Sequence, residues 1–272
     1  MRTLGCNSAP VLGNSIEQNM ENIKNVGFNC TSFDWYDGLD MEKIMSKANE
    51  LGLEVESLKA SFDDINCMWE EGKEGDFFTE KLRRCIIDAA KYKIPYVIMQ
   101  TTVTCIAPKT SHIALLRFGK LVKEAEKQGI KIAFMNAELF RHLGILLYTF
   151  KSDNVGFCYD VGHEVCYTPG LNFLSQFADR LLCVNFHDND GFPSTKIVTS
   201  ESDHHKIPFD GSIDFGKVCT DIKNCGYKGT IMLEVYDNCY KDITPEQFYS
   251  KAYSAAVKIS DIVDSNQKEI KQ

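Results

Sequence analysis

The sequence lacks several features that would each indicate a particular class of protein. No apolar run approaches the roughly 18 residues of a membrane-spanning helix, and the start has no apolar stretch of signal-peptide length. Lys and Arg number 30 against 38 acidic residues, which gives a formal charge of −8. That balance offers no basic surface to a phosphate backbone, so nucleic acid is disfavoured as a partner. We expect a cytoplasmic protein that binds neither membranes nor nucleic acid.

Closely spaced cysteine pairs are also missing. The chain has 11 cysteines, an odd number, and no CxxC motif occurs. Cys158, Cys183 and others stand within apolar runs, where cysteine is usually a small, reduced core residue. The pattern argues against a disulfide framework and agrees with a reducing compartment.

No linker rich in Pro, Ser or Gly divides the chain, so we interpret residues 1–272 as a single domain. Short apolar runs alternate instead with longer amphipathic stretches. The runs predict eight strands, at 2–6, 30–35, 54–60, 95–100, 131–136, 155–160, 181–187 and 230–236. Apolar residues at helical spacing predict helices between them, among others at 15–25, 76–91, 111–128 and 214–224.

This alternation of strands and helices predicts the fold class. Strands separated by helices pair in parallel, because a parallel crossover needs a dozen or more residues. Eight such units predict an α/β protein with a (β/α)8 TIM barrel. An open doubly wound sheet is the alternative, but no GxGxxG motif follows any predicted strand to support it.

Residues with chemically active side chains stand at the ends of three consecutive predicted strands. The sixth strand ends in Asp160, the seventh in His187, and the eighth carries Glu234 near its end. Catalytic residues of a TIM barrel gather at this face, and Asp, His and Glu there could hold Mn, Mg or Zn. The simpler interpretation is that the carboxylates cap helices and His187 makes ordinary hydrogen bonds. Asp203 and His205 alternate in the later segment "DHHKIP" and could point the same way.

At these positions the sequence resembles a known family. The segments "VGFCYDVGH", "VNFHDND", "DHHKIPFDGSIDF" and "GYKGTIMLEV" follow one another as in the sugar phosphate isomerase/epimerase superfamily. These proteins form the xylose isomerase-like TIM barrel, which also includes the zinc-dependent abasic-site endonucleases. The resemblance extends over nearly the whole chain.

The resemblance implies a metal site and its ligands. One divalent ion (Mn, Mg or Zn) would be held by Asp160, His187 and Glu234. Asp203 and His205 would serve as ligands of a second metal, and His205 also as a substrate contact. His163 would contact the substrate, as in the epimerases, or bind a further zinc, as in the endonucleases.

Three positions depart from the family's pattern. Met135 stands where the family has a metal-binding glutamate at the end of the fifth strand, and Lys59 and Gln100 stand where many members have histidines. A thioether cannot replace a carboxylate as a ligand for a hard cation or as a proton-transfer base. We hypothesise that the Lys59 ammonium takes over electrostatic work that a cation performs in relatives. The alternative is that Lys59 is only a surface or strand-edge charge, since lysine is rarely buried unpaired.

The family's isomerases pass a proton between two glutamates and the substrate, through an enediolate. Glu234 matches one of these bases, while Met135 occupies the position of the other. Glu138 and Lys59 are the candidate substitutes, although Glu138 could instead start the fifth helix, where an acidic residue is favoured. Gln100 and Asn136 are expected to contact the substrate.

We therefore expect a metal-dependent isomerase, epimerase or related lyase that acts on a sugar or sugar phosphate. Alternatives are a ligand-binding barrel that has lost catalysis and, less favoured, a phosphodiesterase of the endonuclease kind. Lys109, Lys196 and Lys206 lie on predicted loops at the catalytic face and could receive a phosphate. The sequence leaves the oligomeric state open, and a homo-oligomer is a candidate because this family often forms dimers or larger assemblies.

Overall fold

The computed structural model describes residues 2–104, 106–193 and 202–265. Its strands form one closed barrel in which all neighbours are parallel and follow the order of the sequence. This arrangement confirms the predicted TIM barrel. The strands are β1 (Leu4–Asn7), β2 (Cys30–Asp34), β3 (Glu54–Lys59), β4 (Tyr96–Met99), β5 (Lys131–Met135), β6 (Val155–Asp160), β7 (Leu181–Phe186) and β8 (Ile231–Leu233).

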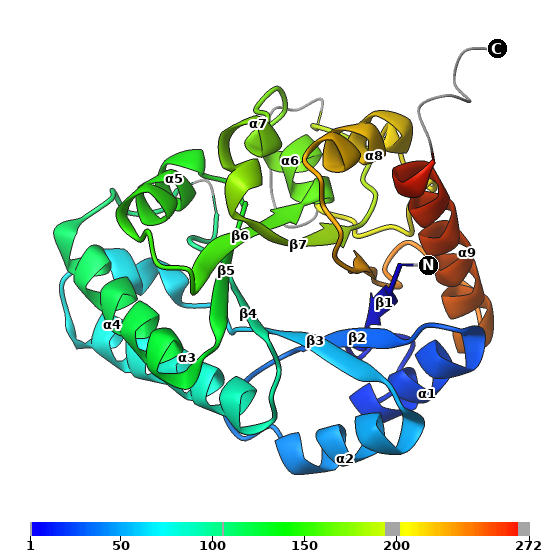
Figure 1. The fold of residues 1–272 in the computed structure, drawn as a ribbon, viewed down its shortest axis with the longest axis horizontal. Helices are drawn as coiled ribbons and strands as arrows, with labels where there is room; N and C mark the ends of the chain where they lie inside the picture. Colours follow the sequence, from blue (N-terminus) through cyan, green and yellow to red (C-terminus); the bar gives the residue numbers. More distant parts are fainter. Residues whose placement is uncertain (1, 105, 194–201, 266–272) are drawn as a thin grey trace.

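Helices surround the barrel on its outer side (Figure 1). They are α1 (Ile16–Val26), α2 (Met41–Leu51), α3 (Lys73–Lys91), α4 (His112–Gln128), α5 (Phe140–Thr149), α6 (Val161–Tyr167), α7 (Phe173–Phe177), α8 (Phe215–Asn224) and α9 (Pro245–Asp264). Short 3-10 helices η1 (Ile65–Trp69) and η2 (Ala178–Arg180) lie in connections. In the described part of the chain, no helix is long and apolar enough to cross a membrane.

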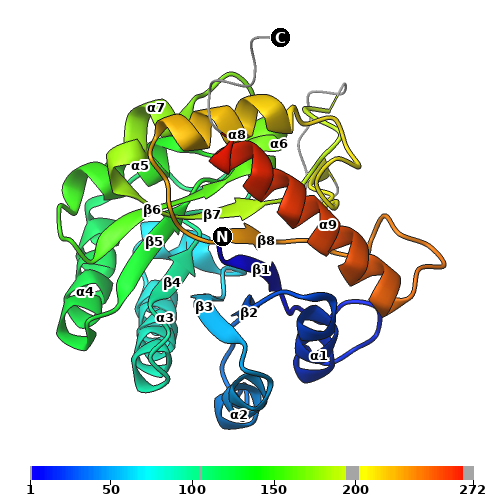
Figure 2. The ribbon, with the colours of Figure 1, turned by 45° about the vertical axis from the view of Figure 1, so that its right-hand side comes forward.

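The last helix closes the ring of helices. Helix α9 lies beside the first strand and the N-terminal end of the chain (Figure 2), and it contacts α1, α8, β1 and β8. Arg2 reinforces this seam, because its guanidinium pairs with Asp264 at 2.7 Å and donates to the carbonyls of Tyr227 and Gly229.

Two buried layers hold the barrel. The larger layer lies between the strands and the helices and includes Trp69, Phe118 and Phe157. A smaller cluster fills part of the lumen and consists of Ile98, Ala133, Met135, Cys158 and Cys183. Cys158 and Cys183 are thus buried core residues with free thiols, as predicted.

Irregularities in β3 and β7 decide which side chains enter the lumen. Opposite β2, residues 31 and 32 pair with 55 and 57, so Glu56 is an extra residue in β3. Opposite β6, residues 157 and 158 pair with 181 and 183, so Leu182 is an extra residue in β7. An extra residue shifts the alternation of side chains by one position. After these bulges Lys59 and His187 point into the barrel mouth rather than toward the helices.

Candidate functional site

The barrel brings the predicted strand-end residues together at its C-terminal mouth. Asp160 and Lys59 end β6 and β3, while His187 and Glu234 directly follow β7 and β8. Their side chains are almost completely buried, with exposed fractions of 0% for Asp160 and His187, 4% for Glu234 and 8% for Lys59. The alternative that Lys59 is a surface charge is therefore wrong, because the ammonium lies inside the mouth.

Four residues form a group of metal-ligand type. His163, His187, Asp203 and His205 each offer one ligand atom, and these atoms all lie within 4.8 Å of one another. Asp203 Oδ2 is 2.9 Å from His163 Nε2 and 3.1 Å from His205 Nε2. The rings of His187 and His205 are stacked, with centroids 3.8 Å apart. We call these four residues the His/Asp group.

Asp160 orients two members of the His/Asp group. Its Oδ1 lies 2.7 Å from His187 Nε2 and accepts from the backbone N–H of His163 at 2.9 Å, which caps helix α6. Asn136 fixes Asp160 in turn, since its side-chain amide donates to the Asp160 carbonyl and accepts from the Asp160 N–H. The Asn136 carbonyl also contacts His163 Nδ1 at 2.8 Å.

The residues present fit a divalent ion. His187 Nδ1 and Asp160 Oδ2 are buried, yet neither makes a hydrogen bond to any residue that the structure describes. His187 Nδ1 lies 3.8 Å from Asp203 Oδ1, too far for a hydrogen bond. Buried polar atoms are nearly always paired, so an unpaired ligand-type atom within the His/Asp group and another on the adjoining Asp160 are a specific reason to expect a cation there.

The charges within the group are mutually supporting. Burial opposes the charged form of His163, but the carboxylates of Asp160 and Asp203 raise its pKa to about 10. Burial likewise disfavours ionised Asp203, but His205 and His163 hold its pKa well below the usual range. A metal that bound here would displace protons from the imidazoles.

A second group surrounds Glu234. Its Oε1 forms an ion pair with Lys59 Nζ and accepts from the Tyr236 hydroxyl at 3.4 Å, while its Oε2 accepts from Asn185 Nδ2 at 2.5 Å. Burial works against both charges, yet the Lys59 ammonium lowers the pKa of Glu234, and Glu234 raises the pKa of Lys59 well above its usual value. Both carboxylate oxygens of Glu234 are therefore engaged by this chain's own donors.

Asp34 completes the charge pattern on this side of the mouth. It ends β2 and pairs in register with Lys59 of β3. Burial raises the pKa of Asp34, and the negative charge of Glu234 contributes to that rise. Lys59 is thus a cation between two acidic groups.

Met135, which stands where the family has a glutamate at the end of the fifth strand, makes this part of the mouth apolar. Met135 is fully buried, and its Sδ lies 3.7 Å from Asn185 Nδ2. Asn185 therefore contacts both the thioether and Glu234. No carboxylate occupies the Met135 position to mirror Glu234.

Glu138 does not start the fifth helix, so that interpretation is wrong. Helix α5 begins at Phe140, after Leu139, and no acidic residue lies in its first turn. Glu138 instead accepts from the backbone N–H of Thr104 at 2.9 Å, and burial raises its pKa. Its other oxygen is buried and has no partner in the described ranges. Glu138 therefore stays a candidate for proton transfer.

The other predicted contacts are placed as follows. Gln100 is half-buried directly after β4, and its substrate role stays a prediction. Lys206 pairs with Asp190 at 2.6 Å, which makes it a poor phosphate receptor. Lys109 is exposed, and Lys196 lies outside the described residues.

Sequence reasoning missed several residues that build the site, among them Asp34, Asn185, Tyr236 and Gly162. Asp34 is the last residue but one of the predicted strand "CTSFDW", and that position was a signal similar to the one that indicated Asp160. The role of Gly162 is steric: a side chain there would overlap the His187 ring.

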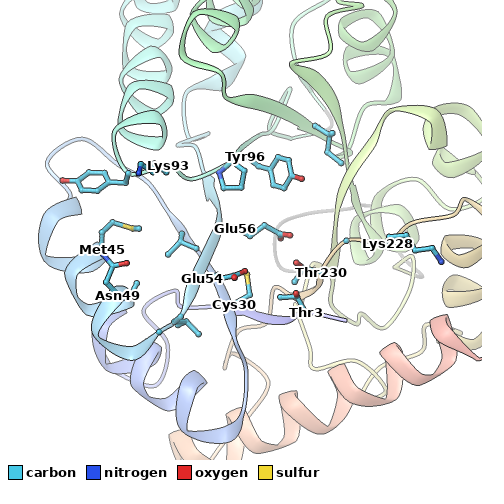
Figure 3. A pocket seen from close by; sticks show the side chains of 18 residues that line it. Thr3, Cys30, Met45, Asn49, Glu54, Glu56, Lys93, Tyr96, Lys228 and Thr230 are labelled. Atoms are coloured by element: carbon cyan, nitrogen blue, oxygen red, sulfur yellow. The ribbon is translucent and has the colours of Figure 1, made fainter. Parts of the chain in front are cut away.

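A cavity of about 820 Å³ lies elsewhere, at the N-terminal mouth of the barrel. Its lining includes Thr3, Glu54, Tyr96 and Thr230, which stand at or next to the starts of strands, and Glu56 points into it (Figure 3). It is therefore at the opposite end of the barrel from the residues described above.

Two curated relatives match part of the chain. The uncharacterized protein y4fM of Sinorhizobium fredii is 31% identical over 132 residues, 48% of this chain and 39% of its own length. The uncharacterized protein MJ1311 of Methanocaldococcus jannaschii is 30% identical over 126 residues, 42% of this chain and 40% of its own length. The chain thus matches about two fifths of the length of these relatives.

Solved structures share the fold over almost the full chain. The IOLI protein, crystallised with a bound zinc atom, superposes with a TM-score of 0.80 at 17% identity and covers 97% of this chain and 100% of that one. A D-tagatose 3-epimerase-like protein gives 0.75 at 21% identity, with coverages of 96% and 98%. L-ribulose 3-epimerase gives 0.74 at 14%, with coverages of 98% and 100%.

A family profile matches residues 20–255, which is most of the chain. The family is described as the xylose isomerase-like TIM barrel. Together with the closed barrel, this match shows that the chain belongs to the xylose isomerase-like TIM barrel family.

Proposed function

We propose that the protein isomerises or epimerises a small polyhydroxylated carbonyl compound, a sugar or sugar phosphate, by proton transfer at the carbon next to the carbonyl. The observation that carries the proposal is the pairing of two buried groups at one barrel mouth. The His/Asp group suits a divalent ion, and the Glu234–Lys59 pair suits proton transfer. The epimerases among the solved structures with this fold support the same reaction class.

We propose that His163, His187, Asp203 and His205 hold one divalent ion and that Asp160 orients His187 for it. Three imidazoles and a carboxylate favour zinc, or manganese, over magnesium, which prefers oxygen ligands. When bound, such an ion would polarise the oxygens of the substrate and so acidify the neighbouring C–H bond.

Glu234 is the base in this proposal. Lys59 keeps the carboxylate ionised, so it is ready to accept the proton from the substrate carbon. The same ammonium can stabilise the negative charge of the enediolate, because both lie in a buried site where electrostatic interactions are strong. Return of the proton to the neighbouring carbon, with transfer of the hydroxyl proton from its oxygen to the former carbonyl oxygen, would complete an isomerisation.

Met135 favours isomerisation over epimerisation. Inversion at one carbon needs proton donors on both faces, whereas transfer between adjacent carbons can use one base on one face. The Met135 side of the mouth has no carboxylate in the place that mirrors Glu234. Glu138, whose raised pKa favours the protonated form, is the candidate if a second proton carrier acts.

The same methionine is the observation that favours a second function, a ligand-binding barrel without catalysis. The two functions are separated by proton exchange, which catalysis requires and binding alone does not.

The test is hydrogen exchange by NMR in D2O over a panel of aldoses, ketoses and their phosphates. We expect one substrate to gain deuterium next to its carbonyl, and Glu234→Gln to slow this about 100- to 10,000-fold. Glu56→Gln, a lumen carboxylate at the opposite mouth, is the matched control and should leave the rate unchanged. Undiminished exchange in Glu234→Gln would rule out the proposed base, and binding without exchange would favour the ligand-binding barrel.

A further inference from the structure

Asp188, the residue after His187, is fully buried and faces four backbone donors. Its Oδ1 accepts from the N–H groups of Asn189 and Ile213 at 2.9 and 3.1 Å. Its Oδ2 accepts from those of Phe209 and Gly211, both at 2.9 Å. One carboxylate therefore satisfies four N–H groups, three of them on the segment that returns to the barrel from the β7–α8 connection.

That returning segment, 202–214, carries two members of the His/Asp group, Asp203 and His205. Its backbone joins the end of β7 through a bridge in which Asp188 and Lys206 exchange two hydrogen bonds of 2.8 Å. Asp188 thus binds the segment through both its main chain and its side chain, immediately beside His187.

The Asn189 side chain also holds the returning segment, through hydrogen bonds to His204 and Asp203. Its Oδ1 accepts from the backbone N–H of His204 at 2.6 Å, and its Nδ2 donates to Asp203 Oδ1 at 2.9 Å and to the Gly162 carbonyl at 3.2 Å. The amide therefore connects the returning segment with the start of helix α6, which carries His163.

The returning segment has an unfavourable backbone. His205 has φ of 45° and Phe209 has φ of 77°, values in the left-handed region that residues with side chains rarely adopt. Such conformations persist only where the surroundings determine them strongly. Asp188 bonds to Lys206 between these two residues, to Phe209 itself and to Gly211 and Ile213 just after it, so these bonds oppose relaxation of the segment away from the mouth.

We propose that Asp188 is the positioning residue of the site: it holds segment 202–214 so that Asp203 and His205 meet His187 and His163. Gly211 fits this role, because a side chain there would overlap the Asp188 carboxylate and the Asn189 carbonyl. The proposal depends on the proposed function only in the experiment that measures metal binding.

The first experiment measures Zn²⁺ affinity of the full chain by competition with a chromophoric chelator. Asp188→Asn keeps the size of the side chain but turns one acceptor into a donor that faces N–H groups. We expect its Zn²⁺ affinity to fall about 10- to 100-fold, as for other residues that orient ligands. Asp210→Asn is the matched control, because Asp210 ties the same segment to Tyr240 and Lys251 on the outer side. Its affinity should stay within about twofold of the wild type.

The second experiment needs no metal. NOE contacts between the His187 and His205 rings, and exchange protection of the Phe209, Gly211 and Ile213 amides, are measured by NMR in the metal-free proteins. We expect Asp188→Asn to lose both and Asp210→Asn to keep the ring contact. If wild-type protein binds no Zn²⁺, the metal proposal fails while this measurement still decides the role of Asp188.

Should Asp188→Asn not fold, Gly211→Ala tests the same role, because its β-carbon would overlap the Asp188 carboxylate and displace it from the segment. The same losses of ring contact, amide protection and Zn²⁺ affinity are expected. An Asp188→Asn protein that retains the ring contact and the wild-type Zn²⁺ affinity would overturn the proposal. Equal losses in Asp188→Asn and Asp210→Asn would overturn it as well, since they would indicate general support of the segment.

Discussion

Gly162 lies between the two residues that the sequence pattern indicated most clearly, Asp160 and His163. It occupies the first turn of helix α6, and the His187 ring fills the space that a β-carbon would need. The segment "DVGH" therefore supplies a carboxylate and an imidazole to the mouth. Its glycine leaves the space that the His187 ring occupies.

Gly162→Ala is predicted to damage the site despite improving helix propensity. Alanine in a helix is favoured over glycine by roughly 0.5–1 kcal/mol. Overpacking a buried position costs about 1–3 kcal/mol, so the clash should dominate. We expect lower stability to urea and weaker Zn²⁺ binding, because His187 must move.

Gly144→Ala is the control for this substitution. Gly144 is buried within α5, where an added β-carbon would meet its nearest neighbour at an ordinary 3.7 Å. It should be neutral or stabilising, with unchanged Zn²⁺ affinity. Stability and affinity in Gly162→Ala that match those of Gly144→Ala would show that His187 does not depend on this gap.

Residue roles differ in how far the sequence could predict them. Asp160, His187 and Glu234 each lie at or near the end of an apolar run, so their places at the strand ends could be inferred from the sequence. Asn185 and Asp188 act through partners far away in the sequence, at Glu234 and at the backbone of 209–213, and no local pattern marks such contacts. Only the alternative role of Glu138 as the start of the fifth helix was wrong, because helix α5 begins two residues later, at Phe140.

At the scale of elements, the bulges in β3 and β7 are the features that periodicity could not predict. Strict alternation from Val55 or Leu181 would turn Lys59 and His187 toward the helices. The extra residues Glu56 and Leu182 reverse this. The sequences "EVESLK" and "LLCVNFH" do not indicate a bulge, because the pairing with the neighbouring strand determines where a bulge forms.

Side-chain contacts join the connections after β3 and β4 to helix α5, which follows β5. Trp69 of η1 donates to the Thr101 carbonyl at 2.7 Å and packs edge-on against the His142 ring. His142 Nε2 lies 2.8 Å from the Pro108 carbonyl, while its Nδ1 is buried without a partner among the described residues. Neutral His142 fits this place, because a protonated ring would bury an unpaired N–H donor.

This geometry predicts a pH dependence of stability. Burial lowers the pKa of His142 below its usual 6.5. At pH values between the folded and unfolded pKa, the unfolded chain therefore binds a proton that the folded protein does not. The stabilisation is complete above about pH 6.5 and is lost as the pH falls through the folded pKa. We expect the free energy of unfolding to decrease from pH 7 to 5.5, and less steeply in His142→Gln. Parallel pH profiles for both proteins would contradict this role of His142.

At the scale of the whole molecule, the barrel could be predicted because its signal is repeated. Eight alternations of strand and helix indicate the same architecture, and errors of a few residues at their ends do not change it. The eighth strand is shorter than expected, Ile231–Leu233 rather than 230–236, yet Glu234 still reaches the mouth. The division of the mouth into two groups could not be predicted, because it depends on which side chains pair across the lumen.

The central claim is that this mouth separates metal binding from proton transfer: the His/Asp group for the ion, and Glu234 with Lys59 for the base. The most direct test is the zinc content and affinity of wild type, Asp203→Asn and Glu234→Gln, each stripped with a chelator and reloaded with Zn²⁺. The claim predicts one Zn²⁺ per wild-type chain, affinity at least about 10-fold weaker in Asp203→Asn, and near wild-type affinity in Glu234→Gln. A Glu234→Gln protein that loses zinc as fully as Asp203→Asn, or a wild type that binds none, would contradict it.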